Sequence, residues 1–154
     1  MKICAIIDID NVYVDSRKWN EKLPTTNDRA KWDEWHANKE LSKPNRPIIK
    51  LTKALHKFMP IFFVTGREDR NGLKEFTIKQ IEKYSHDTIK IGERNKLFMR
   101  KENDFRPSAE VKEEILKKEI LGKGYQPIIA IDDNKENAEM FRKNGITTRL
   151  YTIG

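Results

Sequence analysis

The sequence predicts an α/β protein built on a doubly wound parallel sheet, and three apolar runs carry that prediction. Residues 3–9, 60–64 and 127–131 are short, nearly unbroken apolar segments that each end in polar, chemically capable residues. Such runs are typical of strands buried on both faces of a parallel sheet. Helical patterns lie between them, and this alternation predicts right-handed crossovers and a Rossmann-like arrangement of helices around the sheet.

The first half of the chain supplies two of these strands and an insertion. Residues 3–9 form the expected first strand. The stretch of about residues 14–45 is long, polar and without a clear strand, so we expect it to form a small helical flap inserted after that strand. Apolar spacing predicts helices over residues 48–58 and 73–84, with the strand at 60–64 between them.

The second half repeats the alternation of helix and strand. The spacing of apolar residues predicts helices over residues 108–121 and 134–144, with Gly145 as the C′ residue that ends the second helix. Two weaker strand candidates are residues 88–91 and 147–153, the latter rich in β-branched and aromatic side chains.

Length and composition predict a single domain over residues 1–154. A chain of 154 residues is near the commonest domain size, and 37% hydrophobic residues are enough for a core. The formal net charge of +7 favours polyanionic partners such as nucleic acids or nucleotides, although a basic surface that serves only solubility explains it as well. The single cysteine, Cys4, excludes a disulfide framework.

The N-terminal segment MKICAIIDID shows neither a signal-peptide core nor a membrane span, because two acids follow a short apolar run. We therefore expect a cytoplasmic protein without a membrane partner. The sequence carries no prediction of the oligomeric state.

Four carboxylates are expected at one edge of the sheet. Asp8 and Asp10 end the first strand, and Asp132 and Asp133 follow the strand at 127–131. The carboxyl ends of parallel strands meet at one edge, so these acids should lie close together and need a cation to relieve their repulsion. Mg²⁺ prefers oxygen ligands and keeps room for water and phosphate, so we predict a Mg²⁺ site. For either pair alone, a helix cap or a solvated turn is the alternative.

One of these carboxylates is also a candidate nucleophile. Asp8 would accept a phosphoryl group to form an aspartyl-phosphate, while Asp10 would protonate the leaving oxygen and later activate water. Thr65 with neighbouring backbone amides, and Lys112, could neutralise the transferred oxygens. Taken alone, each has a structural alternative: Lys112 as a solvated helical lysine, Thr65 as a turn residue and Arg67 as a surface cation.

The expected flap is rich in aromatic residues. It contains Trp19, Trp32, Trp35 and His36, with lysines nearby. Aromatic side chains beside cations can stack on a nucleobase while the cations hold its backbone. The i, i+3 spacing of Trp32 and Trp35 favours the other interpretation, in which they pack a short flap helix onto the sheet.

Four motifs follow one another along the chain. They are D-I-D-N-V at residues 8–12, Thr65 after an apolar strand, Lys112 on a predicted helix, and the pair Asp132-Asp133 after a further strand. Their order resembles that of the haloacid dehalogenase superfamily of phosphohydrolases. Asn11 and Val12 depart from the commoner Gly-Thr of the family, but Asn tolerates unusual backbone angles, so we expect activity to survive.

Longer segments resemble the 3′-phosphatase domain of phage polynucleotide kinase-phosphatases. These segments are V-T-G-R-E-D (residues 64–69), F-M-R-K-E-N-D-F-R-P (98–107), V-K-E-E-I (111–115) and A-I-D-D-N (130–134). The resemblance implies a haloacid-dehalogenase-type phosphatase that uses Mg²⁺ and acts on DNA or RNA 3′-phosphate ends.

The resemblance also implies a role for each site residue. Asp8 would be the nucleophile and Asp10 the acid/base. The residues implied to contact phosphate or substrate are Thr65, Gly66, Arg67 and Lys112, and those implied to hold Mg²⁺ are Asp8, Asp10, Asp132 and Asp133.

Three other functions stay open at the level of sequence. The first is a nucleoside monophosphate phosphatase, since the sequence does not separate a polynucleotide from a mononucleotide, DNA from RNA, or a 3′- from a 5′-phosphate. The second is a receiver-like signalling module, which the late position of the second acidic pair disfavours. The third is a non-catalytic nucleic-acid-binding relative, which four clustered carboxylates disfavour.

Overall fold

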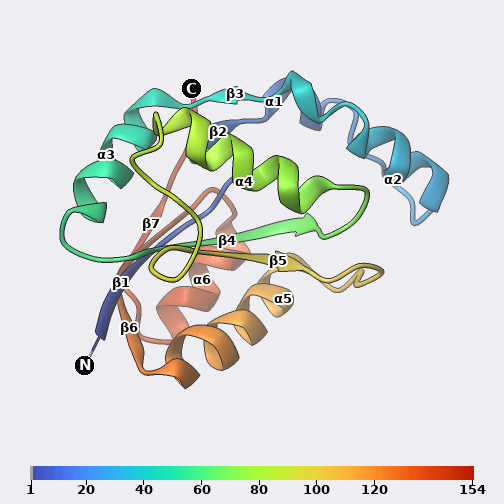
Figure 1. Ribbon diagram of the computed structural model, residues 1–154. Helices are drawn as coiled ribbons and strands as arrows, with labels where there is room; N and C mark the ends of the chain where they lie inside the picture. Colours follow the sequence, from blue (N-terminus) through green and yellow to red (C-terminus); the bar gives the residue numbers. More distant parts are fainter. Residues whose placement is uncertain (1) are drawn as a thin grey trace.

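The computed structural model describes residues 2–154 and contains a five-stranded, fully parallel sheet with helices on both faces (Figure 1). The strand order is β5-β4-β1-β6-β7, which confirms the predicted doubly wound α/β fold. The strands are β1 (Lys2–Ile7), β2 (Val14–Asp15), β3 (Lys43–Pro44), β4 (Ile61–Glu68), β5 (Lys96–Arg100), β6 (Tyr125–Asp132) and β7 (Thr148–Leu150). The helices are α1 (Arg17–Asn20), α2 (Arg29–His36), α3 (Arg46–His56), α4 (Leu73–Tyr84), α5 (Ser108–Ile115) and α6 (Lys135–Lys143). None of the helices formed by residues 2–154 is long and apolar enough to cross a membrane.

The central strand β1 is buried on both faces, and its side chains alternate between two cores. Ala5 and Ile7 pack in the core that α3 and α4 cover, whereas Cys4 and Ile6 pack in the core of α6 and the turns after α5. This is the period of two expected of a strand. Asp8 follows in the register of Cys4 and Ile6, and it faces the α5 side of the sheet.

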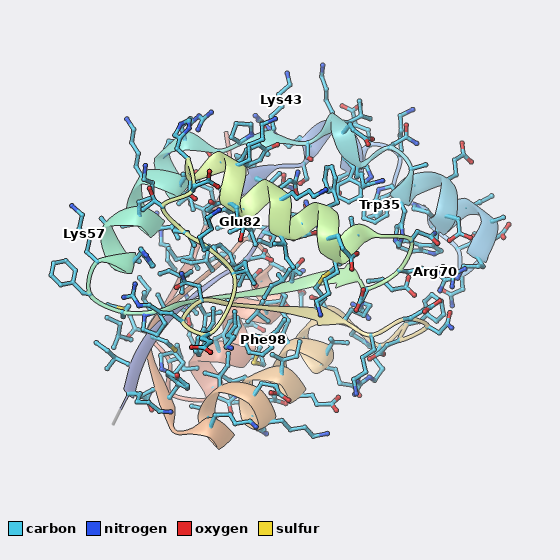
Figure 2. The ribbon with its side chains drawn as sticks, viewed as in Figure 1. Trp35, Lys43, Lys57, Arg70, Glu82 and Phe98 are labelled. Carbon is cyan, nitrogen blue, oxygen red and sulfur yellow. The ribbon has the colours of Figure 1, made fainter. Side chains whose placement is uncertain are left out.

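The flap, residues 14–45, lies beside the N-terminal end of α4. It is mainly helical, as predicted, but it also contains a two-residue antiparallel ribbon of β2 with β3 that the sequence did not indicate. Trp19 and Trp35 form a third apolar cluster with Leu73, the first residue of α4. Figure 2 shows Trp35 between α2 and the start of α4. The flap is therefore packed onto the body of the protein through its tryptophans.

The predicted strand at 88–91 is wrong. Only an isolated bridge joins Ile91 to Asn95, and the strand of the sheet is β5, which pairs in parallel with β4. His86 and Asp87 have positive φ angles of 52° and 61°, so the chain turns tightly immediately before this segment. The apolar centre of β5 is short and has a charged residue at each end, so the sequence pattern did not predict this strand.

Other boundaries differ by smaller amounts. The helix predicted over 108–121 ends as α5 at Ile115 and continues as a π-helical turn, η2 (Leu116–Ile120), and a 3₁₀ turn, η3 (Leu121–Lys123). One further 3₁₀ turn, η1 (Lys39–Leu41), lies in the flap. Gly145 has a φ of 78° after α6, as expected of a residue that ends a helix.

Candidate active site

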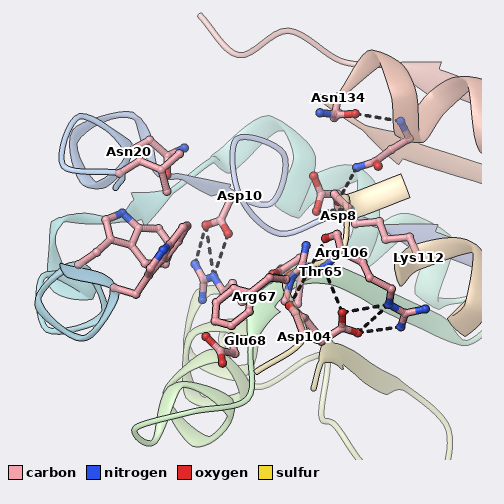
Figure 3. Close-up of a pocket in the computed structure, with 18 of the residues that line it drawn as sticks. Asp8, Asp10, Asn20, Thr65, Arg67, Glu68, Asp104, Arg106, Lys112 and Asn134 are labelled. Atoms are coloured by element: carbon pink, nitrogen blue, oxygen red, sulfur yellow. Dashed lines mark hydrogen bonds and ion pairs between the residues drawn. The ribbon is translucent and has the colours of Figure 1, made fainter. Parts of the chain in front are cut away.

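The polar ends of β1, β4 and β6 meet at one edge of the sheet and line a cavity of about 350 Å³ (Figure 3). Asp8 follows β1, Thr65 lies in β4, and Asp133 follows β6. Lys112 reaches the same cavity from α5, and Asp132 lies buried directly beneath it. Residues far apart in the sequence are thus brought together where ligands bind in parallel α/β sheets.

Lys112 is the centre of a buried charge cluster. Its side chain is almost fully buried, and its Nζ donates to Asp8 Oδ1 at 3.0 Å and to Asp132 Oδ2 at 2.6 Å. Burial lowers the pKa of Lys112, but the two carboxylates outweigh it, so the pKa lies above its ordinary value. Lys112 is therefore a fixed cation at the floor of the cavity and not the solvated lysine of the structural alternative.

Three of the four predicted metal ligands lie together. Carboxylate oxygens of Asp8, Asp132 and Asp133 are all within 4.8 Å of one another. Burial raises the pKa of Asp8 well above its ordinary value, the nearby Asp132 raises it further, and Lys112 offsets only part of this effect. Clustered carboxylate oxygens with an uncompensated electrostatic cost fit a hard divalent cation such as Mg²⁺.

Asp132 is held in place by amide groups at the start of α6. The backbone amide of Asn134 donates to Asp132 Oδ1 at 3.0 Å, and Asn137 Nδ2 lies 3.2 Å from the same oxygen. Asn134 also caps α6, because its side chain accepts from the Asn137 backbone amide. The Asp-Asp-Asn sequence thus fixes a carboxylate and starts a helix at the same point.

Asp10 lies apart from the acidic cluster and is paired with Arg67. Arg67 Nη2 is 2.8 Å from Asp10 Oδ1, Nε donates to Oδ2 at 3.0 Å, and Ser16 Oγ donates to the same carboxylate. Burial raises the pKa of Asp10, but the Arg67 guanidinium and these hydrogen bonds outweigh it and hold the pKa below its ordinary value. Asn11 has a φ of 60°, so the chain leaves the strand direction directly after Asp10.

Arg67 is enclosed and not free at the surface. Its Nη1 donates to Thr77 Oγ1 at 2.8 Å and to Gln80 Oε1 at 2.7 Å, both on α4. The guanidinium carbon lies 5.0 Å from the centre of the Trp19 ring, which belongs to the flap. Arg67 therefore orients Asp10, and in this structure its guanidinium is occupied by protein groups.

Thr65 and Gly66 form the wall of the cavity between β4 and α5. Thr65 is buried, and its Oγ1 accepts from the Arg67 backbone amide at 3.1 Å. A Cβ at Gly66 would lie 3.4 Å from Ser108 Oγ, which is an ordinary van der Waals contact with α5. The backbone can approach a ligand closely at this position.

Several residues of the cavity were not singled out from the sequence. Ser108 accepts from Asn137 Nδ2 at 3.2 Å, while the buried Asn137 Oδ1 has no partner among the described residues. Arg100 donates to the backbone oxygens of Asp104 and Arg106 and so shapes the loop after β5. The only signal available was the F-M-R-K-E-N-D-F-R-P segment, which contains the last three of these residues.

The charged groups that line the cavity are nearly balanced. Five carboxylates face four cationic side chains there: Asp8, Asp10, Glu68, Asp104 and Asp133, with Arg67, Arg100, Arg106 and Lys112. A bound phosphate would add further negative charge. With a phosphate bound, a further cation at the acidic cluster would lower the electrostatic cost.

The flap aromatics divide into two kinds. Trp19 and Trp35 stack on one another with centroids 4.1 Å apart, and each indole N–H donates to the backbone oxygen of the other residue. Trp19 serves packing alone, whereas Trp35, together with Trp32 and His36, also lines the cavity.

Two sets of ion pairs join the flap to the body of the protein. Arg29 of α2 donates to both carboxylate oxygens of Glu68 at 3.0 Å and to Asn103 at 2.9 Å. Arg70, seen in Figure 2 below α2, donates to Asp33 at 3.0 Å. The flap is thus held over the cavity by polar contacts at its rim.

Comparison with known proteins gives one family match and a group of similar folds. The sequence model of the polynucleotide kinase PNKP phosphatase domain matches residues 4–150. Two solved structures, described as the Pnkp1/Rnl/Hen1 RNA repair complex and the Pnkp1/Rnl/Hen1 complex, each align over the whole chain with a TM-score of 0.70, at 18% and 20% identity. The chain spans 43% and 47% of those chains, less than half of either. No curated protein matches it.

Proposed function

The chain belongs to the PNKP phosphatase-domain family of the haloacid dehalogenase superfamily, and on that premise we propose that it removes phosphate from the 3′ ends of polynucleotides. The observation that carries the proposal is the arrangement of Asp8, with Lys112 3.0 Å away and a second acid group, Asp10, at the same cavity. A nucleophile, a fixed cation and an acid/base group are the parts that phosphoryl transfer through a carboxylate needs.

In the first half of the reaction, a carboxylate oxygen of Asp8 attacks the phosphorus. The bond between phosphorus and the 3′ oxygen breaks as the new bond to Asp8 forms. Asp10 gives the leaving oxygen a proton, which it takes up when the negative charge of the bound phosphate opposes its ionisation. Thr65 and Lys112 stabilise the equatorial oxygens of the phosphoryl group as it passes between them.

In the second half, a water molecule attacks the aspartyl-phosphate. Asp10, now ionised, takes a proton from that water, and the bond between phosphorus and Asp8 breaks to release inorganic phosphate. Arg67 serves this step because it holds the pKa of Asp10 low and its carboxylate in one orientation.

Asp8, Asp132 and Asp133 are the residues that would hold Mg²⁺, and the ion would supply positive charge beside the transferred phosphoryl oxygens. Asp10 lies outside that cluster, and we propose that its role is acid/base chemistry alone.

Three observations support a polynucleotide as the substrate. The family is described as the phosphatase domain of the polynucleotide kinase PNKP, and one of the similar structures is described as an RNA repair complex. The net charge of +7 suits a polyanion.

We further propose that residues 1–154 act as one domain with the flap as a small cap over the site. A cavity of about 350 Å³ suits one nucleotide, so a nucleoside monophosphate is the second candidate substrate.

The test is phosphate release in Mg²⁺ and in EDTA from matched substrates. These are a 3′-phosphorylated oligonucleotide, its 5′-phosphorylated counterpart, and nucleoside 3′- and 5′-monophosphates, each as DNA and RNA forms. The proposal predicts that the 3′-phosphorylated oligonucleotide has the highest kcat/KM and that EDTA abolishes release. Faster release from mononucleotides would assign a nucleotidase, and no release from any substrate would refute the catalytic proposal.

A further inference from the structure

The cavity has an inner and an outer part with different chemistry. The inner part holds the carboxylates, Thr65 and Lys112, which the proposed phosphoryl transfer uses. The outer part is lined by Leu23 and Trp32 of the flap and by Phe105 of the loop after β5. No step of the phosphate chemistry uses these three apolar side chains.

The apolar groups of the outer part come from two segments far apart in the sequence, the flap and the loop after β5. Leu23 is 47% exposed and Phe105 is 48% exposed, yet both line the same cavity. Large apolar side chains that stay open to water around a cavity are typical of ligand contacts. Their ligand would be flat or apolar and would be attached to the group held at the inner part.

Trp32 and Phe105 are each held by contacts with other side chains. Trp32 packs edge-on against Trp35 with centroids 5.6 Å apart, and its indole N–H donates to the Thr26 backbone oxygen at 2.7 Å. The Arg29 guanidinium carbon lies 5.0 Å from the centre of the Phe105 ring while Arg29 also binds Glu68. A preformed site of this kind loses little ordering entropy when a ligand binds.

A buried polar group also lines the cavity. His36 lines the cavity, is only 2% exposed, and its Nδ1 has no hydrogen-bond partner among residues 2–154. Burial lowers the pKa of His36, so the ring is neutral and offers one donor and one acceptor. An unpaired buried nitrogen is costly unless a ligand or water satisfies it.

From this juxtaposition of Leu23, Trp32 and Phe105 with an unpaired His36, we propose that the outer part of the cavity binds the nucleobase of the phosphorylated terminal nucleotide. The inference rests on the proposed function and names the part of the substrate that the flap recognises. The aromatic and aliphatic side chains flank the base, and His36 hydrogen-bonds to its edge. The cavity of about 350 Å³ is near the lower end of ligand sites and suits one nucleotide.

The experiment compares two ends that differ only in the terminal base. Fluorescence anisotropy measures binding of a 5′-labelled, 3′-phosphorylated oligonucleotide that ends either in thymidine or in an abasic tetrahydrofuran residue. The protein is the full chain carrying Asp8→Asn, in Mg²⁺, so that no turnover occurs. The inference predicts that the thymidine end binds roughly tenfold more tightly, as expected of one stacked base.

Variants then identify the side chains that distinguish the thymidine end from the abasic end. Phe105→Ala should reduce the ratio of the two dissociation constants below threefold, whereas Phe58→Ala, at an apolar residue that is 78% exposed and does not line the cavity, should leave it unchanged. His36→Leu should also reduce the ratio, and His36→Gln, which keeps a polar group, should retain most of it.

The outcomes separate the two proposals. Equal binding of both ends, or a ratio that Phe105→Ala leaves intact, overturns the nucleobase site even if phosphate release from 3′ ends is normal. Preferential binding of the thymidine end by Asp8→Asn, together with no phosphate release by the wild-type chain, would support the nucleobase site and refute the phosphatase proposal.

Discussion

The floor of the cavity and the flap above it are held by different forces. At the floor, Lys112, Asp8 and Asp132 form a buried charge cluster whose members have few ways to rearrange. The flap is held by stacked tryptophans and by partly exposed ion pairs such as Arg29–Glu68. Changes at the floor should therefore abolish phosphate release or lower the free energy of unfolding, whereas changes at the rim of the flap should alter KM.

The strongest test of the floor is Asp8→Asn. An amide cannot form the aspartyl-phosphate, so phosphate release should fall by roughly 10⁴-fold or more. The thermal unfolding midpoint should stay at or above that of the wild type, because the raised pKa of Asp8 marks a carboxylate whose charge is costly. Asp15→Asn, at an acid outside the cavity, is the control, and wild-type-like turnover by Asp8→Asn would refute the mechanism.

The next largest effect is expected for Lys112→Met. The change leaves two buried carboxylates without their cation, so the free energy of unfolding should fall by about 3–5 kcal/mol. Because a bound cation would replace the lost ammonium, the loss should be smaller in Mg²⁺ than in EDTA.

Urea unfolding with and without Mg²⁺ measures this difference. Lys118→Met is the matched control, since Lys118 is 70% exposed and, among residues 2–154, pairs only with Glu114 at 2.8 Å. An equal loss of stability in Mg²⁺ and in EDTA would argue against a cation site at the acidic cluster.

Arg67→Lys should have an intermediate effect. A lysine keeps the charge but cannot bind Asp10, Thr77 and Gln80 together, so Asp10 loses its fixed orientation. We expect kcat to fall about a hundredfold, the lower range for general acid/base catalysis, with KM little changed. Steady-state kinetics measure this, with Arg46→Lys, at a residue that does not line the cavity, as the control. A raised KM with normal kcat would instead assign Arg67 to substrate binding.

The smallest effect is expected at the rim of the flap. Arg29→Gln removes the two contacts with Glu68, and the free energy of unfolding should fall by only about 1 kcal/mol. KM for 3′-phosphorylated ends should rise roughly threefold while kcat stays the same. Arg17→Gln breaks an exposed ion pair with Asp15 and should change neither constant. A large fall in kcat for Arg29→Gln would remove the distinction between floor and flap.

The floor was largely predictable from the sequence because its residues follow buried apolar runs. The runs at β1, β4 and β6 are long enough to be recognised, and their polar ends must meet in a parallel sheet. The edge strand β5 was not predicted, since Leu97, Phe98 and Met99 are flanked by Lys96 and Arg100 and resemble a surface segment.

The setting of Arg67 could not be predicted from the sequence. Its partners Thr77 and Gln80 lie one helix later, and Asp10 lies 57 positions earlier, so no local pattern links them. The orientation of Asp10 depends on its ion pair with Arg67, which only the fold brings about. The division of the tryptophans into packing and cavity residues likewise depends on tertiary contacts.

The contact between Trp19 and Arg67 limits how this protein could be redesigned. Trp19 belongs to the flap, and its ring covers the guanidinium that orients Asp10. Grafting a foreign flap onto this body to change substrate preference would therefore uncover Arg67 and disturb the acid/base group at the same time. A functional exchange must keep an aromatic side chain at position 19, so the flap is not an interchangeable module.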